Sequence, residues 1–295
     1  MVRLRRILLL SNPNSPGAAS LRSVLDMWSQ AGITVEHVSC GRASSLSPII
    51  LARAGESDVV AIAGGDGTMN AAAQGLMASQ KRLGILPTGT ANDLARTFAI
   101  PTDLDRAAQI IVSGHERRID LGNANGHLFF NVASVGLAAH LAKGLTRDTK
   151  RRFGRLSYAL AAVRTALLAR SFTAEIKSDR GVAKVTTLQI AIGNGRFYGG
   201  GSLVDRTAEI DDGCLDLCSL ELKRVWVLAL MVRSFRSGDF KLWREVRTAR
   251  CNTFEIDTPK PRPVNLDGEL LTATPLRVCV HRDALSVLVP PTAPS

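Results

Sequence analysis

The 295-residue sequence contains little that would place it in several common classes of protein. Its five cysteines are an odd number scattered along the chain, which excludes a disulfide-rich scaffold and favours a reducing compartment such as the cytoplasm. The cysteines and histidines show no zinc-ligand spacing. The longest apolar run, residues 225–232, has eight residues, far fewer than the roughly 18–20 that a membrane-spanning helix needs. The sequence therefore predicts no transmembrane segment.

Aromatic residues are also scarce, at 5% of the chain, and the sequence carries no recognised nucleic-acid-binding signature. Positive charge is abundant, because 37 Lys and Arg residues against 26 Asp and Glu give a formal net charge of +11. Such a balance indicates an anionic partner, which could be a nucleotide, a nucleic acid or a membrane surface. The missing signature makes nucleic acid the least favoured of the three.

The first part of the chain alternates short apolar runs with helical patterns. Apolar runs at 7–10, 33–38, 59–63 and 83–86 are followed by helical stretches near 18–31, 46–54, 68–79 and from 91, with a last helix near 104–112. This alternation is typical of a parallel sheet covered by helices on both faces. Residues 1–119 are therefore predicted to form an α/β domain.

From about residue 120 the pattern changes to short apolar runs separated by Gly, Asn and Asp turns, which favours antiparallel strands. Strands are expected at 127–132, 172–176, 186–192, 214–220, 253–256, 276–280 and 285–289, with helical insertions near 156–170 and 225–250. Residues 120–295 are thus predicted to form a second, mostly antiparallel β domain.

A glycine-rich turn follows the apolar run at 59–63 and reads Gly64-Gly65-Asp66-Gly67-Thr68-Met69-Asn70. We expect a helix to begin at Thr68 as its N-cap, so the turn would offer backbone N–H groups and the positive end of a helix dipole to a phosphate. An ordinary βα turn without a ligand has a similar composition. Asp66 favours the phosphate interpretation, because its carboxylate could reach a metal–phosphate complex.

Two similar turns follow other strands, Pro87-Thr-Gly-Thr-Ala-Asn-Asp-Leu94 and the segment beginning Asn12-Pro-Asn-Ser15. The carboxyl ends of parallel strands share one edge of the sheet, which is where open α/β sheets bind ligands. Neither the Walker sequence nor the dinucleotide GxGxxG sequence occurs. The three turns together predict a phosphate-binding edge of a less common kind.

Two acidic turns stand out in the second domain. The segment Glu209-Ile-Asp-Asp212-Gly-Cys214 could bind a hard cation through Asp212 and backbone carbonyls, although an ordinary Asp-Gly hairpin turn explains it equally well. The segment Asn265-Leu-Asp267-Gly268-Glu269 is also a plausible hairpin turn, and it offers Glu269 as a general base for a hydroxyl group.

Much of the positive charge lies in two segments, 143–170 and 223–250, where eight basic residues in each are mixed with apolar and aromatic ones. Basic amphipathic helices suit an anionic membrane interface. A solvated helix face over a packed core is the alternative interpretation, and it is as good for the first segment.

The combination of Gly64-Gly-Asp-Gly-Thr68 with Pro87-Thr-Gly-Thr-Ala-Asn-Asp-Leu94 resembles the diacylglycerol kinase catalytic family, in particular its soluble bacterial lipid kinases. The resemblance extends over nearly the whole chain and includes Asn12-Pro13, Gly193-Asn-Gly195, Asp212-Gly213 and Asp267-Gly-Glu269. It implies an NAD kinase-like or diacylglycerol kinase-like α/β domain that binds ATP, a C-terminal β-sandwich, and phosphoryl transfer in the cleft between them.

The resemblance also implies roles for individual residues. The nucleotide phosphates and Mg²⁺ would be bound by Gly64, Gly65, Asp66, Gly67, Thr68 and Asn70, with Thr90, Asn12 and Ser15 completing the ATP site. A structural Mg²⁺ would be bound by Asp212 with the carbonyls of Glu209 and Cys214. Glu269 would accept the proton of the lipid hydroxyl, and Asp66 would be the second catalytic residue.

The sequence therefore predicts a cytoplasmic, peripherally membrane-associated kinase that uses ATP to phosphorylate a lipid hydroxyl, with diacylglycerol as the first choice. Two alternatives stay open: an NAD kinase-like phosphotransferase acting on a soluble substrate, because the first turn is shared with NAD kinases, and a non-catalytic nucleotide or lipid sensor. No sequence feature identifies an oligomer interface, although a homodimer is conceivable.

Overall fold

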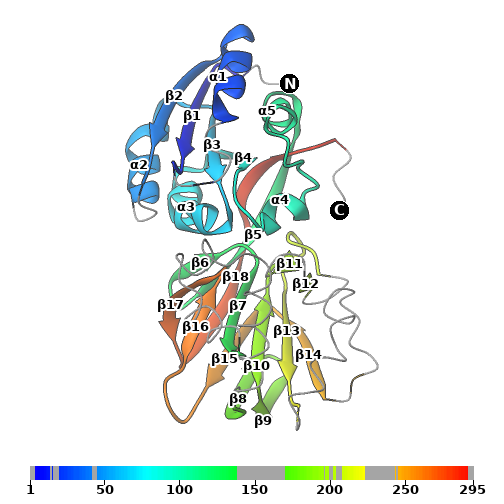
Figure 1. Cartoon of the computed structure of the whole chain (residues 1–295). Helices are drawn as coiled ribbons and strands as arrows, with labels where there is room; N and C mark the ends of the chain where they lie inside the picture. The colour runs from blue at the N-terminus through cyan, green and yellow to red at the C-terminus, as the bar shows by residue number, and fades with distance from the viewer. Residues whose placement is uncertain are drawn as a thin grey trace, which may run out of the picture. The chain divides into compact units, whose positions relative to one another are not determined.

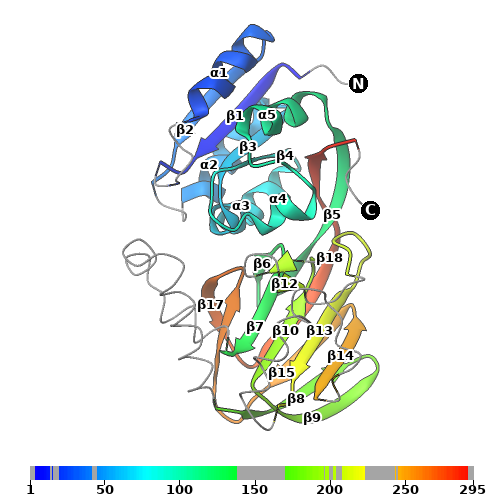
Figure 2. The same cartoon turned by 45° about the vertical axis from the view of Figure 1, so that its right-hand side comes forward.

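The structure is a computed structural model that describes residues 4–13, 15, 20–41, 45–137, 170–195, 197–198, 202–203, 208–222, 243 and 245–291. It divides into two compact units, one formed by residues up to 121 and from 281, the other mainly by residues 122–280. Figures 1 and 2 give two views of the chain. Among the described residues, no helix combines the length and the apolar character needed to cross a bilayer.

The first unit contains a parallel sheet in the order β2-β1-β3-β4-β18. The strands β1 and β3 are almost entirely buried, which explains why their apolar runs show no alternation. The strands are β1 (Arg6–Ser11), β2 (Thr34–Ser39), β3 (Val59–Gly64), β4 (Arg82–Pro87) and β18 (Leu276–Val289).

Helices cover both faces of this sheet. The helix α1 packs with α5, and α2 packs with α3, and Figure 1 shows the two pairs on opposite faces. Buried Leu21, Val24 and Trp28 form one face of α1, and the Trp28 indole donates a hydrogen bond to the Ala108 carbonyl of α5 at 3.3 Å. The helices are α1 (Leu21–Gln30), α2 (Leu46–Arg53), the short 3₁₀ helix η3 (Ala54–Glu56), α3 (Asp66–Ser79), α4 (Asp93–Thr97) and α5 (Leu104–Ser113). The predicted parallel α/β fold is confirmed.

The second unit is built around an antiparallel sheet in the order β14-β13-β10-β7-β16-β17. A buried apolar core joins this sheet to a second layer that includes β8, β9, β15 and the first part of β18. The sheet consists of β7 (Val132–Gly136), β10 (Gln189–Gly193), β13 (Leu215–Leu220), β14 (Val246–Cys251), β16 (Pro263–Leu266) and β17 (Glu269–Ala273). The other strands are β5 (His115–Ala124), β6 (His127–Phe129), β8 (Phe172–Ser178), β9 (Gly181–Thr187), β11 (Phe197–Tyr198), β12 (Ser202–Leu203) and β15 (Thr253–Asp257). The predicted antiparallel β-sandwich is confirmed.

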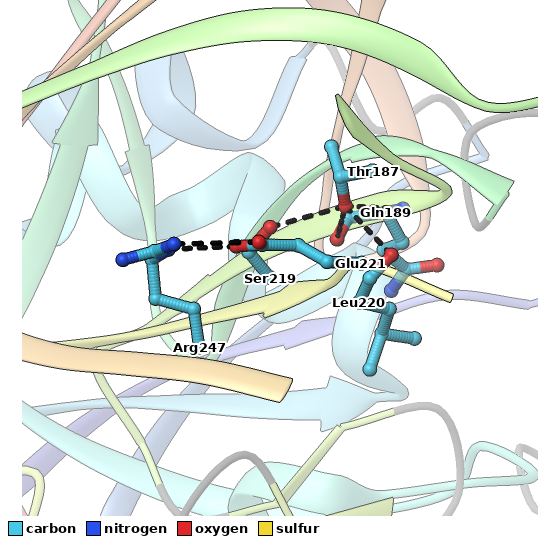
Figure 3. Close-up of polar contacts among 6 residues, drawn as sticks. All are labelled: Thr187, Gln189, Ser219, Leu220, Glu221 and Arg247. Carbon is cyan, nitrogen blue, oxygen red and sulfur yellow. Dashed lines mark hydrogen bonds and ion pairs between the residues drawn. The ribbon is translucent and has the colours of Figure 1, made fainter. Parts of the chain in front are cut away.

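A buried hydroxyl fixes one corner of the antiparallel sheet. The Thr187 hydroxyl donates toward the carbonyls of Gln189 and Leu220, both at 2.9 Å, and lies 3.1 Å from the Ser219 hydroxyl (Figure 3). Because a buried polar group without partners would cost stability, this set of contacts explains how Thr187 and Ser219 can both be fully buried.

Two strands continue across the division between the units. The predicted domain boundary near residue 120 lies inside β5, which reaches Ala124. The strand β18 was expected as two separate strands but is continuous from Leu276 to Val289, and its last residues lie in the first unit. Val287 pairs with Leu83 of β4, so the end of the chain completes the parallel sheet.

One predicted helix is partly wrong. Residues 246–250, expected at the end of a helical insertion, form the strand β14, which pairs with β13 along its whole length. Sheet pairing therefore overrides the helical pattern here. The rest of that insertion, apart from residues 243 and 245, and the insertion near 156–170, apart from residue 170, lie outside the described residues.

Candidate functional site

Three strands of the first unit end side by side at one edge of the parallel sheet. Ser11, the last residue of β1, pairs with Ala63 of β3, and Gly64 pairs with Pro87, the last residue of β4. The Asn12 amide continues this edge by donating to the Ala63 carbonyl at 3.1 Å. The three turns that the sequence placed at the carboxyl edge therefore do lie next to one another.

The glycine-rich turn after β3 leads directly into α3. The helix begins at Asp66 with Gly65 as its N-cap, so the prediction that Thr68 caps the helix is wrong. The amides of Thr68 and Met69 both donate to the Gly65 carbonyl, at 2.9 and 3.1 Å, and the Thr68 side chain is buried. An earlier start puts Asp66 and Gly67 in the first helical turn, where the helix dipole favours an anion.

The turn after β4 packs against this first turn, backbone against backbone. The Thr88 amide donates to the Gly64 carbonyl at 3.2 Å. A Cβ atom on Gly89 would lie 2.4 Å from the Gly65 Cα atom, and one on Gly65 would lie 3.1 Å from the Gly89 Cα atom. The approach leaves no room for a side chain at Gly89, which explains why both turns carry glycine. We call residues 64–67 and 88–92 the double turn.

Asn92 closes the second half of the double turn. Its side-chain oxygen accepts a hydrogen bond from the Gly89 amide at 3.1 Å, and its side-chain nitrogen donates to the Gly89 carbonyl at 3.0 Å. Asn92 adopts a left-handed conformation with φ of 51°, which asparagine tolerates better than most residues. Asn92, the first residue of the Asn-Asp pair at this helix start, therefore has a structural role that sequence reasoning did not assign.

The Asp66 carboxylate lies within the double turn. Its Oδ1 atom accepts a hydrogen bond from the Leu94 amide of α4 at 3.2 Å. Burial raises the pKa of Asp66 above its ordinary value, and the nearby Asp93 carboxylate raises it further, against the lowering effect of backbone amides. A charged carboxylate in such a position is stabilised by a cation, as expected of a side chain that binds Mg²⁺ together with phosphate.

Two buried side-chain oxygens near the double turn have no hydrogen-bond partner in the described structure, Asn70 Oδ1 and Thr88 Oγ1. Asn70 follows Asp66 by four residues on α3, so the two side chains lie on the same face of the helix. Unpartnered buried polar atoms are rare and call for an explanation. A carboxylate with neighbouring amide and hydroxyl oxygens is a donor set that fits a hydrated Mg²⁺ and its phosphate oxygens.

The remaining predicted ATP residues lie at or near the same edge. Thr90 is exposed at the tip of the second turn, and Asn12 is half-buried where β1 ends. The Ser15 amide donates to the Asn12 carbonyl at 3.0 Å, which forms a turn after β1. The structure thus brings the first-unit residues of the predicted site to one sheet edge.

In the second unit, the Asp267 carboxylate organises the turn that carries Glu269. Its Oδ2 atom accepts the Phe130 amide at 2.7 Å, and its Oδ1 atom accepts the amides of Asn131 and Val132 at 3.1 and 2.9 Å. These contacts coincide with the break between β6 and β7, which the sequence predicted as one strand. The sequence motif contains Asp267 but does not indicate this role.

Glu269 is the first residue of β17 and pairs with Leu266 of β16. Asp267 and Gly268 form the two-residue connection, both with positive φ, 46° and 99°, as in the tight hairpin turns that favour Asp-Gly. The Glu269 side chain is half-buried. The hairpin interpretation of this segment is therefore correct, and it is compatible with Glu269 acting as a base because the turn fixes its backbone.

Further buried polar groups line the strands beside this hairpin. Ser134 of β7 and Asn265 of β16 are opposite each other in the sheet. Their Ser134 Oγ and Asn265 Oδ1 atoms, and Asn131 Oδ1, have no hydrogen-bond partner within the described parts of the chain. The sequence motif includes Asn265 without assigning it a role, and no sequence signal marked Ser134 or Asn131, because isolated Ser and Asn residues are uninformative without the pairing register.

The Asp212 turn does not fit the predicted Mg²⁺ site. The carboxylate accepts the Cys214 amide on Oδ1 at 2.8 Å and the Glu209 amide on Oδ2 at 3.3 Å, and it forms an ion pair with Arg250. The guanidinium group of Arg250 therefore occupies the position beside the Asp212 carboxylate that a divalent cation would take. The described residues contain no group of three or more acidic, His or Cys side chains that could hold a metal ion.

Comparison with known proteins agrees with the fold. Residues 6–124 match the diacylglycerol kinase catalytic domain, and residues 131–289 match the YegS C-terminal NAD kinase beta sandwich-like domain. A crystal structure of a diacylglycerol kinase from Bacillus anthracis superposes with a TM-score of 0.80 at 20% sequence identity, covering 100% of both chains. Another crystal structure from the same bacterium gives a TM-score of 0.88 at 22% identity, covering 100% of this chain and 98% of the other. At these identities the superpositions show the fold alone.

Sequence relatives are closer. A Pectobacterium atrosepticum protein named "Probable lipid kinase YegS-like" is 32% identical over 96% of this chain and 96% of its own length. A protein of the same name from Pseudomonas putida is 34% identical over 82% of this chain and 80% of its own length. With both domains matched in order and relatives of this similarity, the chain belongs to the YegS-like lipid kinase family, which contains the diacylglycerol kinase catalytic domain.

Proposed function

We propose that the protein uses ATP and Mg²⁺ to phosphorylate the hydroxyl group of a membrane lipid, with diacylglycerol as the first candidate and phosphatidic acid as its product. The observation that carries the proposal is the double turn, in which Gly65 and Gly89 bring two backbone segments together around the Asp66 carboxylate. Backbone amides at a helix start and a partly buried acid are suited to a metal-bound triphosphate.

In this proposal the first unit positions the nucleotide. The turn of Gly64, Gly65 and Gly67 would let the phosphates approach the backbone, and Asp66 and Asn70 would hold the Mg²⁺. The buried Thr68 lies between them in the sequence of α3 and belongs to the same site in this proposal. Thr90, Asn12 and Ser15 border the nucleotide from the neighbouring strand ends. Phosphoryl transfer depends mainly on alignment and on neutralising phosphate charge, and Mg²⁺ supplies that neutralisation when bound.

The second unit supplies the base. Glu269 removes the proton from the lipid hydroxyl while the hydroxyl oxygen attacks the γ-phosphorus of ATP. The bond between that phosphorus and the oxygen that remains on ADP breaks. Asp267 is a positioning residue, because it fixes the turn that carries Glu269 through the amides of residues 130–132. The protein would meet its substrate as a cytoplasmic, peripheral membrane enzyme, attracted to anionic lipid by its positive charge.

The test is incubation of the purified protein with γ-labelled ATP and a panel of acceptors, namely diacylglycerol, other lipid alcohols, sphingoid bases and NAD, with Mg²⁺ or with EDTA. We expect Mg²⁺-dependent labelling of a lipid, strongest for diacylglycerol. Labelling of NAD and of no lipid would make the protein an NAD kinase-like phosphotransferase. Binding of ATP without labelling of any acceptor would make it a sensor.

A further inference from the structure

Arg250 forms ion pairs with the acidic turn before β13, which is a role that a metal ion could otherwise fill. Arg250 lies on β14 directly opposite Asp216 of β13. Its Nη2 atom pairs with Asp212 Oδ2 in the turn, and its Nε atom lies 3.7 Å from Asp216 Oδ1. One guanidinium group therefore joins the turn, the strand that follows it and the neighbouring strand.

Arg250, Asp212 and Asp216 are partly buried, so water screens their charges only in part. The side chains of Asp212 and Asp216 are only 18% and 10% exposed, and that of Arg250 is 36% exposed. Burial alone would lower the pKa of Arg250, but the carboxylates of Asp216 and Asp212 outweigh it and the pKa lies above its ordinary value. Arg250 therefore carries its charge at all physiological pH values, and a divalent cation would have to approach against that positive charge.

The carboxylate of Asp212 is also already occupied on both oxygens. Its oxygens accept hydrogen bonds from two backbone amides of the turn, those of Cys214 and Glu209. The Arg250 guanidinium group binds the same carboxylate through its side chain. An acidic turn held in this way needs a positive charge, since two partly buried carboxylates would otherwise repel each other.

We infer that the guanidinium group of Arg250 is a built-in substitute for a divalent cation at the turn formed by residues 209–214, so that this turn folds without a metal ion. Truncating Arg250 would leave Asp212 and Asp216 without their cation and would open a site for Mg²⁺ or Ca²⁺. The inference concerns the second unit alone and does not depend on the lipid substrate.

The test compares thermal unfolding of the full chain in EDTA, in Mg²⁺ and in Ca²⁺, without nucleotide, together with the metal content of the dialysed protein. Five proteins are needed: wild type, Asp212→Asn, Arg250→Ala, the double variant, and Arg247→Ala as a control. Comparing each protein with its Asp212→Asn counterpart separates this turn from Mg²⁺ binding at Asp66. We expect the wild type and Asp212→Asn to respond alike to metal and to retain no metal ion.

Arg250→Ala in EDTA should unfold about 5 °C lower than wild type, as expected when one partner of a partly buried ion pair is removed. Millimolar Mg²⁺ or Ca²⁺ should restore at least half of that loss, and the double variant should show no such recovery. Arg247→Ala is the matched control, because Arg247 is on the same strand and pairs with Glu221 at 2.7 Å in a more exposed setting (Figure 3). It should unfold within about 1–2 °C of wild type and gain no metal response.

Two results would overturn the inference. The first is a wild-type protein that retains one metal ion per chain and loses it on Asp212→Asn substitution, which remains measurable even if Arg250→Ala does not fold. The second is a folded Arg250→Ala protein whose stability does not respond to either cation, because Arg250 would then not occupy a cation site.

Discussion

Gly89 lies so close to Gly65 that a Cβ atom on Gly89 would stand 2.4 Å from the Gly65 Cα atom. This contact joins the turns after β3 and β4, and it fixes the distance between the start of α3 and the loop that leads into α4. The same approach surrounds Asp66 with backbone groups, since its carboxylate accepts the Leu94 amide. The proposed phosphate site is therefore a product of backbone packing, and small changes there have specific consequences.

Gly89→Ala should force the two turns apart. We expect a loss of stability of about 1–3 kcal/mol, as for other overpacked sites, and weaker ATP binding because the backbone around Asp66 is displaced. Thermal unfolding and nucleotide titration measure the two effects. Gly55→Ala is the control, since no atom lies within 4 Å of its Cβ position. If Gly89→Ala binds ATP as tightly as Gly55→Ala does, the close approach has no role in nucleotide binding.

Asp66→Asn should remove activity and at the same time stabilise the metal-free protein near neutral pH. Burial raises the pKa of Asp66, so the folded state disfavours the charged carboxylate relative to the unfolded state. The charged Asp66 carboxylate therefore lowers the stability of the folded protein at pH values above its folded-state pKa. This penalty disappears as the pH falls through the folded-state pKa and then through the pKa of the unfolded state. Asparagine keeps an oxygen for the Leu94 amide without the charge.

The measurement for this variant is the difference in unfolding temperature between Asp66→Asn and wild type, recorded in EDTA from pH 8 to pH 4. A positive difference at pH 8 that shrinks toward pH 4 is expected. Asp105→Asn, an exposed acid in the first turn of α5, should show no such gain. An Asp66→Asn protein less stable than wild type at pH 8 contradicts the assigned cost of the buried charge.

Substitutions of Asp267 and of Glu269 should affect different quantities, the first mainly stability and the second mainly kcat. Asp267→Ala removes the acceptor of three backbone amides, so we expect a loss of about 2–3 kcal/mol in unfolding free energy. Glu269→Gln should leave the unfolding temperature unchanged and lower kcat by about 10²–10⁴-fold, as for a lost general base. Full activity in Glu269→Gln would remove Glu269 from the mechanism.

Binding to vesicles should depend on lipid charge and on salt. With a net charge of +11, the protein should partition onto anionic vesicles and dissociate as the ionic strength rises above about 0.1 M, where the screening length is about 10 Å. Neutral vesicles are the control. Equal binding to neutral and anionic vesicles would show that charge does not direct the protein to the membrane.

The order of elements in the first unit could be predicted from the sequence because buried parallel strands read as apolar runs. The predicted strand ends at residues 10 and 63 fall one residue before the observed ends at Ser11 and Gly64, which was accurate enough to place the turns at one edge. The predicted start of α3 was wrong, because Thr68 is in general a better N-cap residue than Gly65, whereas the helix begins at Asp66 where the turn packs against Gly89, with only 3.1 Å between a Cβ position on Gly65 and the Gly89 Cα atom.

Long-range contacts explain the other differences. The break between β6 and β7 depends on Asp267, more than 130 residues away in the sequence, and the strand conformation of Val246–Cys251 depends on pairing with β13. Similarly, Arg250 reaches Asp212 from a strand that the sequence pattern assigned to a helix. Neither periodicity nor motif spacing contains such pairings. The residues of the Asp212 turn alone therefore could not show that an arginine, and not a metal ion, lies beside the carboxylate.

The central claim is that the double turn binds the triphosphate through Asp66 and its metal ion. Its most direct test is the affinity for ATP with Mg²⁺, measured by calorimetry on the wild type, Asp66→Asn and Glu269→Gln. The account predicts that wild type and Glu269→Gln bind alike and that Asp66→Asn loses most of the Mg²⁺-dependent affinity. Unchanged Mg²⁺-dependent binding in Asp66→Asn would contradict it.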